Sequence, residues 1–145
     1  GNMTAWEQQL TACDCRITMP RRAVMRVLLE AESPLAPQEI LERGRQVHAR
    51  LGLVTVYRTL ELFLRLNLIR RVHREDGCHG YVLTSPGHHH VLLCRDCGRA
   101  VEFPGGDDLQ VLIQRVERET GYLVDEHLLQ LFGRCTTCQQ GESHA

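Results

Sequence analysis

The stretch that decides the fold covers residues 51–72 and reads "LGLVTVYRTLELFLRLNLIRRV". Its apolar residues recur at i, i+4, i+7 and i+8, the spacing of one face of an α-helix. These residues are Val56, Leu60, Phe63 and Leu64. The pattern predicts a helix that begins after Gly52 and packs this face on a core, with Arg58 and Arg65 on the opposite side. Leu62 interrupts that polar side, and periodicity alone gives no reason for it.

Elements on both sides of this helix complete a recognisable order. Apolar spacing and proline positions predict helices at residues 6–13, at residues 18–33 and from Pro34 to Val47. Downstream, β-prone segments at residues 68–73 and 80–83 flank an Asp-Gly turn. Three helices, a fourth with a cationic side and a hairpin are the order of a winged helix-turn-helix DNA-binding domain.

The second half of the chain predicts a small α/β module. Strands are expected at residues 88–94, 99–103 and 122–133, with a helix at residues 108–121 that Gly121 ends. We therefore expect an α+β protein with a winged-helix domain, a hinge, a dimerisation domain that buries apolar surface against a second copy, and a flexible tail. The expected bounds are 3–84, 85–87, 88–138 and 139–145, with residues 1–2 taken as the remnant of a tag.

Charge and cysteine usage indicate the class of partner and the compartment. Residues 1–85 carry 12 arginines against 9 acidic residues, residues 86–145 carry 5 against 9, and the chain has no lysine. Arginine suits bidentate contacts with phosphate and guanine, although codon usage is an alternative explanation. No apolar run approaches the roughly 20 residues of a membrane span, so a cytoplasmic protein is expected. Seven cysteines in such a chain favour metal ligands over a disulfide framework.

Two Cys-x-x-Cys pairs carry the strongest chemical signal. Their members are Cys94, Cys97, Cys135 and Cys138. Four thiolates satisfy a tetrahedral zinc ion, and the two-residue gap lets both sulfurs of a pair reach one ion. Gly98 and Gly133 flank the pairs and are expected to allow tight turns. The sequence therefore predicts a structural zinc site that ties the end of the chain to the first strand of this module.

Histidines predict further metal sites. In an extended strand, His88 and His90 share one face while His89 lies on the other. Together with His127 the first two predict a site for a divalent ion, although a histidine such as His127 can also be an ordinary core residue. Asp107 is the expected fourth ligand, with Asp108 or Gln110 as alternatives, and favourable placement at a helix amino terminus is the competing explanation for the acids.

A second histidine-rich cluster is expected across the hinge. It would combine His73, Cys78 and His79 on or beside the wing with His89 of the following strand. A metal held by both sides of a hinge would fix the angle between the DNA-binding and dimerisation modules. The alternative is a solvated turn that binds no metal.

The combination of these motifs resembles the ferric uptake regulator (Fur) family of metal-dependent repressors. The resemblance runs from about Arg16 to Cys138 and is carried by "RITMPRRAVMRVL", "GLVTVYRTLELFLRLNLI", the histidine-rich strand before "CRDCG", and "HLLQLFGRCTTC". It implies a homodimer that binds operator DNA when loaded with metal. It also implies that the histidine site senses metal and that the cysteine site is structural. The DNA-binding residues implied by this match and by the cationic helix side are Arg21, Thr55, Tyr57, Arg58 and Arg65.

The helix of the second module departs from the family pattern at one ligand position. The carboxylate that completes the family's sensing site falls at Gln110 or Leu109, depending on where the count begins. Neither residue is acidic. Asp107 or Asp108 would then substitute, or the site would be weak.

The hinge ligands also depart from the family pattern. A carboxylate and a later histidine of iron-type members fall at Val82 and Val91, and a wing cysteine of some zinc-type members falls at Thr84. Cys78 and His79 would compensate. A sulfur ligand beside imidazoles favours zinc over ferrous iron as the sensed ion.

These observations lead to a functional expectation with two alternatives. We expect a metal-responsive transcriptional repressor that controls zinc or iron uptake, not an enzyme. One alternative is a peroxide sensor of the same family, in which iron at the histidine site oxidises a ligand. The other is a zinc-dependent enzyme, but neither an HExxH nor a deaminase motif is present.

Overall fold

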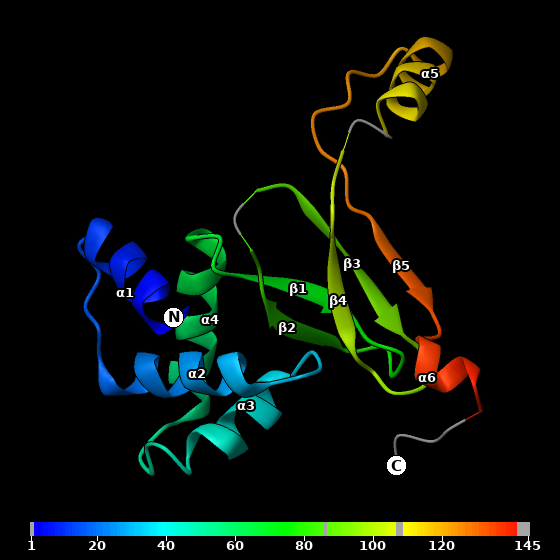
Figure 1. Ribbon diagram of the computed structural model, residues 1–145. Helices are drawn as coiled ribbons and strands as arrows, with labels where there is room; N and C mark the ends of the chain where they lie inside the picture. The colour runs from blue at the N-terminus through cyan, green and yellow to red at the C-terminus, as the bar shows by residue number, and fades with distance from the viewer. Residues whose placement is uncertain (1, 86, 107–108, 142–145) are drawn as a thin grey trace. The chain divides into compact units, whose positions relative to one another are not determined.

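The computed structural model describes residues 2–85, 87–106 and 109–141, which form helices and a hairpin followed by a sheet (Figure 1). This order confirms the predicted α+β fold class. The chain divides into two compact units, Gly1–Ser85 and Pro86–Ala145. Among the described residues, no helix has both the length and the apolar character that crossing a bilayer would need.

The amino-terminal unit begins with four helices. They are α1 (Asn2–Ala12), α2 (Met19–Glu30), α3 (Pro37–Gly44) and α4 (Leu53–Arg65). The hydroxyl of Thr18 accepts a hydrogen bond from the backbone N–H of Arg21 at 3.3 Å and caps α2. Helix α3 begins at Pro37, later than predicted, because Leu35 forms a bridge with Tyr81 and keeps this segment extended.

Helix α4 lies at the centre of this unit. It contacts α2, α3 and strand β1 (Ile69–His73). Three residues of the predicted stripe, Val56, Leu60 and Phe63, are buried, and Leu64 is partly buried. Phe63 packs against Trp6 of α1 with ring centroids 6.0 Å apart. Leu62 is also buried, with 6% of its surface exposed. Because neighbours surround α4 on more than one side, the helix needs a wider apolar surface than the single stripe seen in the sequence.

The wing is the predicted hairpin. Strand β1 pairs antiparallel with β2 (His79–Leu83), in a register that joins Ile69 to Leu83 and His73 to His79. Gly77 has a φ of 83°, in the left-handed region that favours glycine, and Asp76 accepts a hydrogen bond from the backbone N–H of Cys78 at 2.9 Å. The predicted Asp-Gly turn is confirmed.

The carboxyl-terminal unit contains a sheet in the order β4-β3-β5. Its strands are β3 (His89–Cys94), β4 (Ala100–Pro104) and β5 (Gln130–Gly133), and its helices are α5 (Gln110–Thr120) and α6 (Thr136–Gln139). Strand β4 runs antiparallel to β3 and β5 runs parallel to it. Gly121 ends α5 in a left-handed conformation, as predicted.

Three expectations for secondary structure and cysteine pairing are wrong. The strand predicted at residues 122–133 is limited to Gln130–Gly133. Val91 pairs with Gln130 in parallel, and β3 has only two residues before Val91 with which earlier residues could pair. Gln139, assigned to a flexible tail, instead ends α6; residues 142–145 of that tail lie outside the described residues. Cys13 and Cys15 form a disulfide, whereas the cysteine count favoured metal ligands over a disulfide framework.

Replacing Leu62 with alanine tests whether the neighbours of α4 explain its burial. We expect Leu62→Ala to lower the free energy of unfolding of the amino-terminal unit by about 2–5 kcal/mol, through lost apolar burial and a residual cavity. Val54→Ala, on the same helix but 63% exposed, is the control and should change it by less than about 0.5 kcal/mol. Urea unfolding followed by the fluorescence of Trp6, the single tryptophan, measures both. Equal effects of the two variants would contradict the packing described.

Candidate metal centres and DNA-binding face

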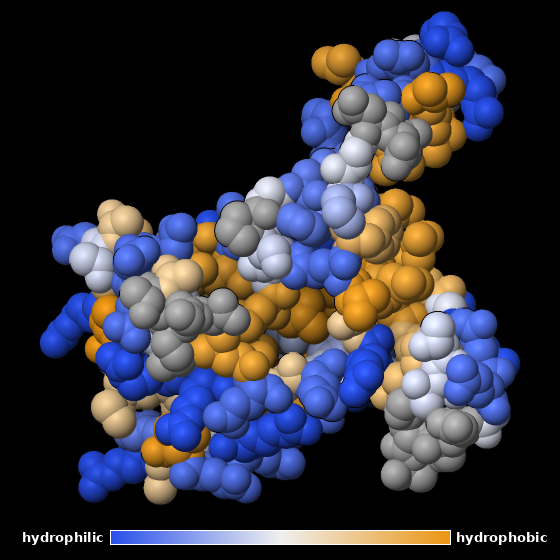
Figure 2. Space-filling model, in the orientation of Figure 1, coloured by the Kyte–Doolittle hydropathy of each residue, from blue (hydrophilic) through white to orange (hydrophobic). Residues whose placement is uncertain are grey.

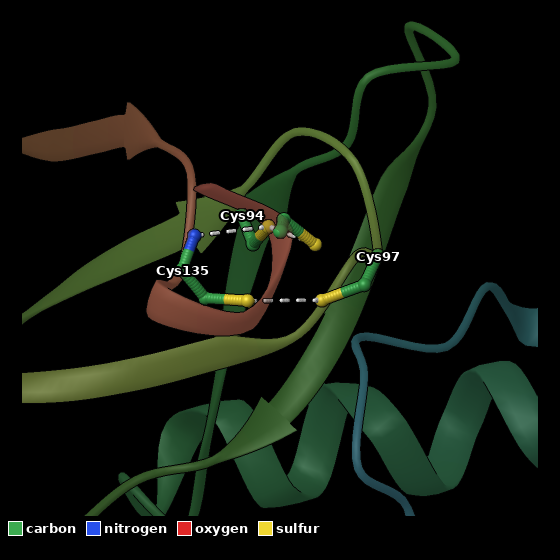
Figure 3. Close-up of side chains that lie close together, drawn as sticks. Cys94, Cys97 and Cys135 are labelled. Atoms are coloured by element: carbon green, nitrogen blue, oxygen red, sulfur yellow. Dashed lines mark hydrogen bonds between the residues drawn. The ribbon is translucent and has the colours of Figure 1, made fainter. Parts of the chain in front are cut away.

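Four cysteine sulfurs converge where β3 ends and α6 begins. Cys94 ends β3, Cys97 follows it in the turn to β4, and Cys135 and Cys138 lie at the start of α6 and within it (Figure 3). The Sγ atoms of Cys94 and Cys138 are 3.7 Å apart, those of Cys97 and Cys135 are 3.9 Å apart, and all four lie within 4.8 Å of one another. Thiolates bound to tetrahedral zinc at about 2.3 Å are roughly 3.8 Å apart. The cluster therefore has the dimensions of a structural zinc site.

Backbone geometry and one ion pair hold this cluster together. Gly98 has a φ of 79°, which only glycine adopts easily, and its N–H donates to the carbonyl of Cys94 at 3.0 Å. Arg134 donates to Asp96 at 2.7 Å and to the carbonyl of Cys138 at 3.0 Å, so it joins the two cysteine pairs. The sequence analysis missed this role of Arg134. The expected turn at Gly133 is wrong, because this residue ends β5 without a positive φ.

The surroundings shift the thiol pKa values in opposite directions. The backbone N–H of Cys135 donates to the sulfur of Cys94 at 3.4 Å and is the largest cause that lowers the pKa of Cys94, to about 6. Burial raises the pKa of Cys138. The backbone N–H of Arg99 acts to lower the pKa of Cys97, but burial and neighbouring thiols outweigh it and raise that pKa. A bound cation would remove this conflict by stabilising every thiolate together.

Three imidazoles form a second cluster at the other end of β3. The ligand nitrogens of His88, His90 and His127 lie within 4.8 Å of one another, and the Nε2 atoms of His88 and His127 are 3.3 Å apart. His90 is buried, while His88 is exposed. Three neutral imidazoles at this spacing fit a divalent metal ion. The structure thus brings together the three predicted histidines, although His127 precedes β5 instead of lying within a strand.

Gly105 fixes the position of one imidazole. Its N–H donates to the carbonyl of His88 at 2.7 Å, and a Cβ atom at this position would lie 2.8 Å from Cδ2 of the His88 ring. Any larger residue would displace the ring. The sequence analysis missed this residue, although the Gly-Gly pair directly after β4 could have identified it. Asp107, the expected fourth ligand, and its alternative Asp108 lie outside the described residues.

The residues expected at a hinge site fall into both units. His73 and His79 are a cross-strand pair in the wing, with ring centroids 4.8 Å apart. Cys78 is exposed and directly precedes β2 in the turn of the wing. His89 begins β3 in the carboxyl-terminal unit.

The exposed side of α4 is the candidate DNA-binding face. Tyr57, Arg58 and Arg65 are exposed along it, and Thr55 is half-buried near the start of the helix. Arg21 lies in the first turn of α2, where its guanidinium donates to the carbonyl of Arg16. Val54, 63% exposed on the same side of α4, is a candidate contact that the sequence analysis missed. The sequence feature that could have identified Val54 is its position as an apolar residue outside the buried stripe.

A winged helix-turn-helix unit followed by a sheet with two separate clusters of metal-ligand type defines a metal-responsive DNA-binding regulator. The model of the ferric uptake regulator family matches residues 12–132, and the chain belongs to that family. Its members are metal-responsive DNA-binding repressors of metal uptake that bind operator DNA. The family has no catalytic activity, which excludes the alternative of a zinc-dependent enzyme.

Individual relatives and solved structures agree with this assignment. A ferric uptake regulation protein of Bacillus subtilis is 33% identical over 141 residues, covering 94% of each chain. One of Cupriavidus metallidurans is 34% identical over 122 residues, covering 83% of this chain and 85% of its own. A zinc-bound manganese uptake regulator is 31% identical with a TM-score of 0.60, covering 89% of this chain and 97% of its own. A zinc uptake regulator complexed with zinc and DNA, 18% identical, has the same fold with a TM-score of 0.77, covering 95% and 93%.

Metal analysis tests the four-cysteine cluster. We expect protein purified without added metal to retain zinc after mild chelation, and Cys138→Ser to lose it because one thiolate ligand is gone. Cys78→Ser is the control, since this exposed cysteine lies outside the cluster and its loss should leave the zinc content unchanged. Elemental analysis of folded, reduced protein measures both variants. Equal zinc content in the two would show that the cluster does not hold the ion.

Zinc uptake should also release protons from this cluster. At pH 7 the raised pKa values keep Cys97 and Cys138 protonated without metal, whereas the pKa of Cys94, about 6, leaves it mostly ionised. Zinc binds thiolates, so both protons must leave, and zinc affinity should fall as the pH is lowered. Titration of the metal-free protein with zinc in weak buffer, followed with a pH indicator, measures the release. Uptake without proton release would contradict the assignment.

Proposed function

We propose that this protein represses genes of metal homeostasis as a metal-loaded homodimer, with zinc or ferrous iron as the regulatory ion. One observation carries the proposal: β3 has a four-thiol cluster at one end and a three-imidazole cluster at the other. Four thiolates saturate a tetrahedral ion and leave no position for exchange. Three imidazoles leave further coordination positions open, as an exchangeable site requires.

We assign different roles to the two clusters on this chemical basis. Cys94, Cys97, Cys135 and Cys138 would hold a structural zinc ion. His88, His90 and His127 would hold the sensed ion, with Asp107 as the proposed fourth ligand. The relatives include regulators named for iron, zinc and manganese, and imidazole ligands suit several of these ions.

A further regulatory ion is proposed at the hinge. His73 and His79 would supply two imidazoles from the wing, with Cys78 and His89 as the remaining ligands. The proposed modules are a DNA-binding domain at residues 3–84, a hinge at 85–87 and a dimerisation domain at 88–138. An ion bound by both sides of this hinge would favour the arrangement in which two recognition helices reach successive turns of the major groove.

DNA recognition is assigned to α4 and the start of α2. Arg58, Arg65 and Arg21 would contact phosphate or guanine, because a guanidinium makes bidentate bonds to both. Tyr57 would pack on a thymine methyl group, and Thr55 would bind near the start of the helix. Support comes from the exposure of Tyr57 and Arg58 on a helix whose opposite side is buried.

A homodimer is supported by the apolar surface of the carboxyl-terminal unit. Val101, Leu92 and Leu131 pair across the three strands and form one exposed row on the sheet, from 37% to 53% exposed. Apolar surface also gathers on α5, which has no buried residue (Figure 2). A second copy of the chain would cover this row, since isologous contact buries the same patch twice.

The histidine cluster also supports a second candidate function, a peroxide sensor of the same family. Iron held by imidazoles could oxidise one of its own ligands on reaction with peroxide. Loss of DNA binding that requires both iron and peroxide would support this candidate. Insensitivity of the iron-loaded protein to peroxide would exclude it.

Arg58 provides a test of the DNA-binding face. We expect Arg58→Ala to weaken binding to duplex DNA at least about fivefold and, for a phosphate contact, to reduce the slope of log affinity against log salt by about one. Arg118→Ala, at an exposed arginine of α5 outside this face, is the control and should leave both unchanged. Fluorescence anisotropy over a range of salt concentrations measures both quantities. Normal binding by Arg58→Ala would remove the assignment.

His127 provides a test of metal sensing. We expect His127→Ala to lose most of the stimulation of DNA binding by added metal while retaining the chelator-resistant zinc, because the two clusters do not share ligands. His48→Ala, at a histidine outside both clusters, should respond like the unmodified protein. Anisotropy with and without the divalent ion, paired with elemental analysis, measures the response. A normal metal response in His127→Ala would overturn the sensing role.

A further inference from the structure

Two cysteines outside both metal clusters meet at the end of α1. Cys13 and Cys15 form a disulfide with a Cα–Cα distance of 5.3 Å. Asp14 between them has a φ of 60°, the left-handed conformation that turns the chain back on itself and brings neighbouring residues together. Cys13 is exposed and Cys15 is half-buried. Small molecules in solution can therefore reach the pair.

We propose that Cys13 and Cys15 are a reversible thiol–disulfide site that exchanges with low-molecular-weight disulfides such as oxidised glutathione. The thiolate of Cys13 attacks one sulfur of the small disulfide, and the other sulfur leaves as a thiolate. The thiolate of Cys15 then attacks the Cys13 sulfur of the mixed disulfide and displaces the second small thiolate. The protons of the two cysteines pass to the two released thiols. The cysteine pair loses two electrons and the small disulfide gains them.

The structure favours this pair over the other cysteines as the exchange site. Cys94, Cys97, Cys135 and Cys138 form the metal cluster, where a bound zinc ion would protect their sulfurs. Cys78 is exposed but outside that cluster, and the sequence offers no second cysteine close to it that would resolve a mixed disulfide. Cys13 and Cys15 combine exposure with a resolving partner two residues away.

Exchange at this site acts on the junction between α1 and α2. The backbone N–H groups of Cys13, Asp14 and Cys15 donate to the carbonyls of Gln9, Thr11 and Leu10 at 3.3, 3.1 and 2.8 Å. These three bonds close the end of α1. The disulfide holds the same turn covalently, whereas after reduction the hydrogen bonds hold it without the covalent link.

The junction is joined to the DNA-binding unit on both sides. Cys15 packs against the hydrophobic core that includes Trp6. Immediately after it, the carbonyl of Arg16 accepts a hydrogen bond from the guanidinium of Arg21. The redox state of the pair therefore sets how firmly the chain is held directly before the first turn of α2.

The experiment uses the full-length, zinc-loaded protein, first reduced and then incubated with oxidised glutathione. Alkylation and peptide mass spectrometry should show Cys13 and Cys15 joined, lighter by two hydrogens, while Cys78 carries glutathione. Hydrogen exchange at the backbone amides of Cys13, Asp14 and Cys15 should be about tenfold slower in the oxidised form, the effect that loop-closure entropy gives for so short a loop. Cys13→Ser removes one exposed sulfur, so it cannot form the disulfide. With or without oxidised glutathione, its backbone amides should undergo hydrogen exchange at the rate of the reduced protein.

Two results would overturn the proposal. One is that, under conditions that modify Cys78, Cys13 and Cys15 stay reduced and are therefore alkylated, or that each of them carries glutathione. The other is that the disulfide forms but the three amides exchange at the same rate in both states. Because Cys13→Ser changes only an exposed side chain, agreement of its exchange rates with those of the reduced protein also shows that the variant is folded.

Discussion

The parallel pairing of β5 with β3 is the constraint on which both metal clusters depend. The register places Val91 beside Gln130 and Cys94 beside Gly133. Four residues of pairing therefore bring the second Cys-x-x-Cys to the first at one end of β3. At the other end, the same pairing places His127 next to His88. A slip of one residue would turn the apolar side chains to the wrong face and separate both sets of ligands.

The two clusters differ in how many coordination positions they would leave open on a bound ion, and the proposed division between a structural and a sensing site rests on this difference. Four sulfurs at tetrahedral spacing close the coordination of one ion and join two segments that lie far apart in the sequence. Three imidazoles, of which that of His88 is exposed, leave room for exchange, and Gly105 leaves the space that the His88 ring occupies. Under this proposal, a protein that loses the sensed ion would keep its fold, because a different cluster would stabilise the sheet.

Local patterns predicted most of the fold, and non-local contacts account for the errors. The stripe on α4, the Asp-Gly turn of the wing and the end of α5 at Gly121 each follow from residues close in the sequence. The late start of β5 depends on how far β3 extends, and the burial of Leu62 depends on neighbours in α2 and α3. The Cys13–Cys15 disulfide was missed because a rule about compartments was applied to every cysteine, although Asp14 brings this pair together locally.

The most direct test of a separate sensing site is a titration of zinc-retaining protein, stripped of exchangeable metal, with zinc or ferrous iron. DNA binding by anisotropy and bound metal by elemental analysis are measured at each point. The account predicts that DNA binding rises together with the exchangeable ion while the chelator-resistant zinc stays constant. DNA binding that ignores the exchangeable ion, and falls only when the zinc of the four cysteines is removed, would contradict it.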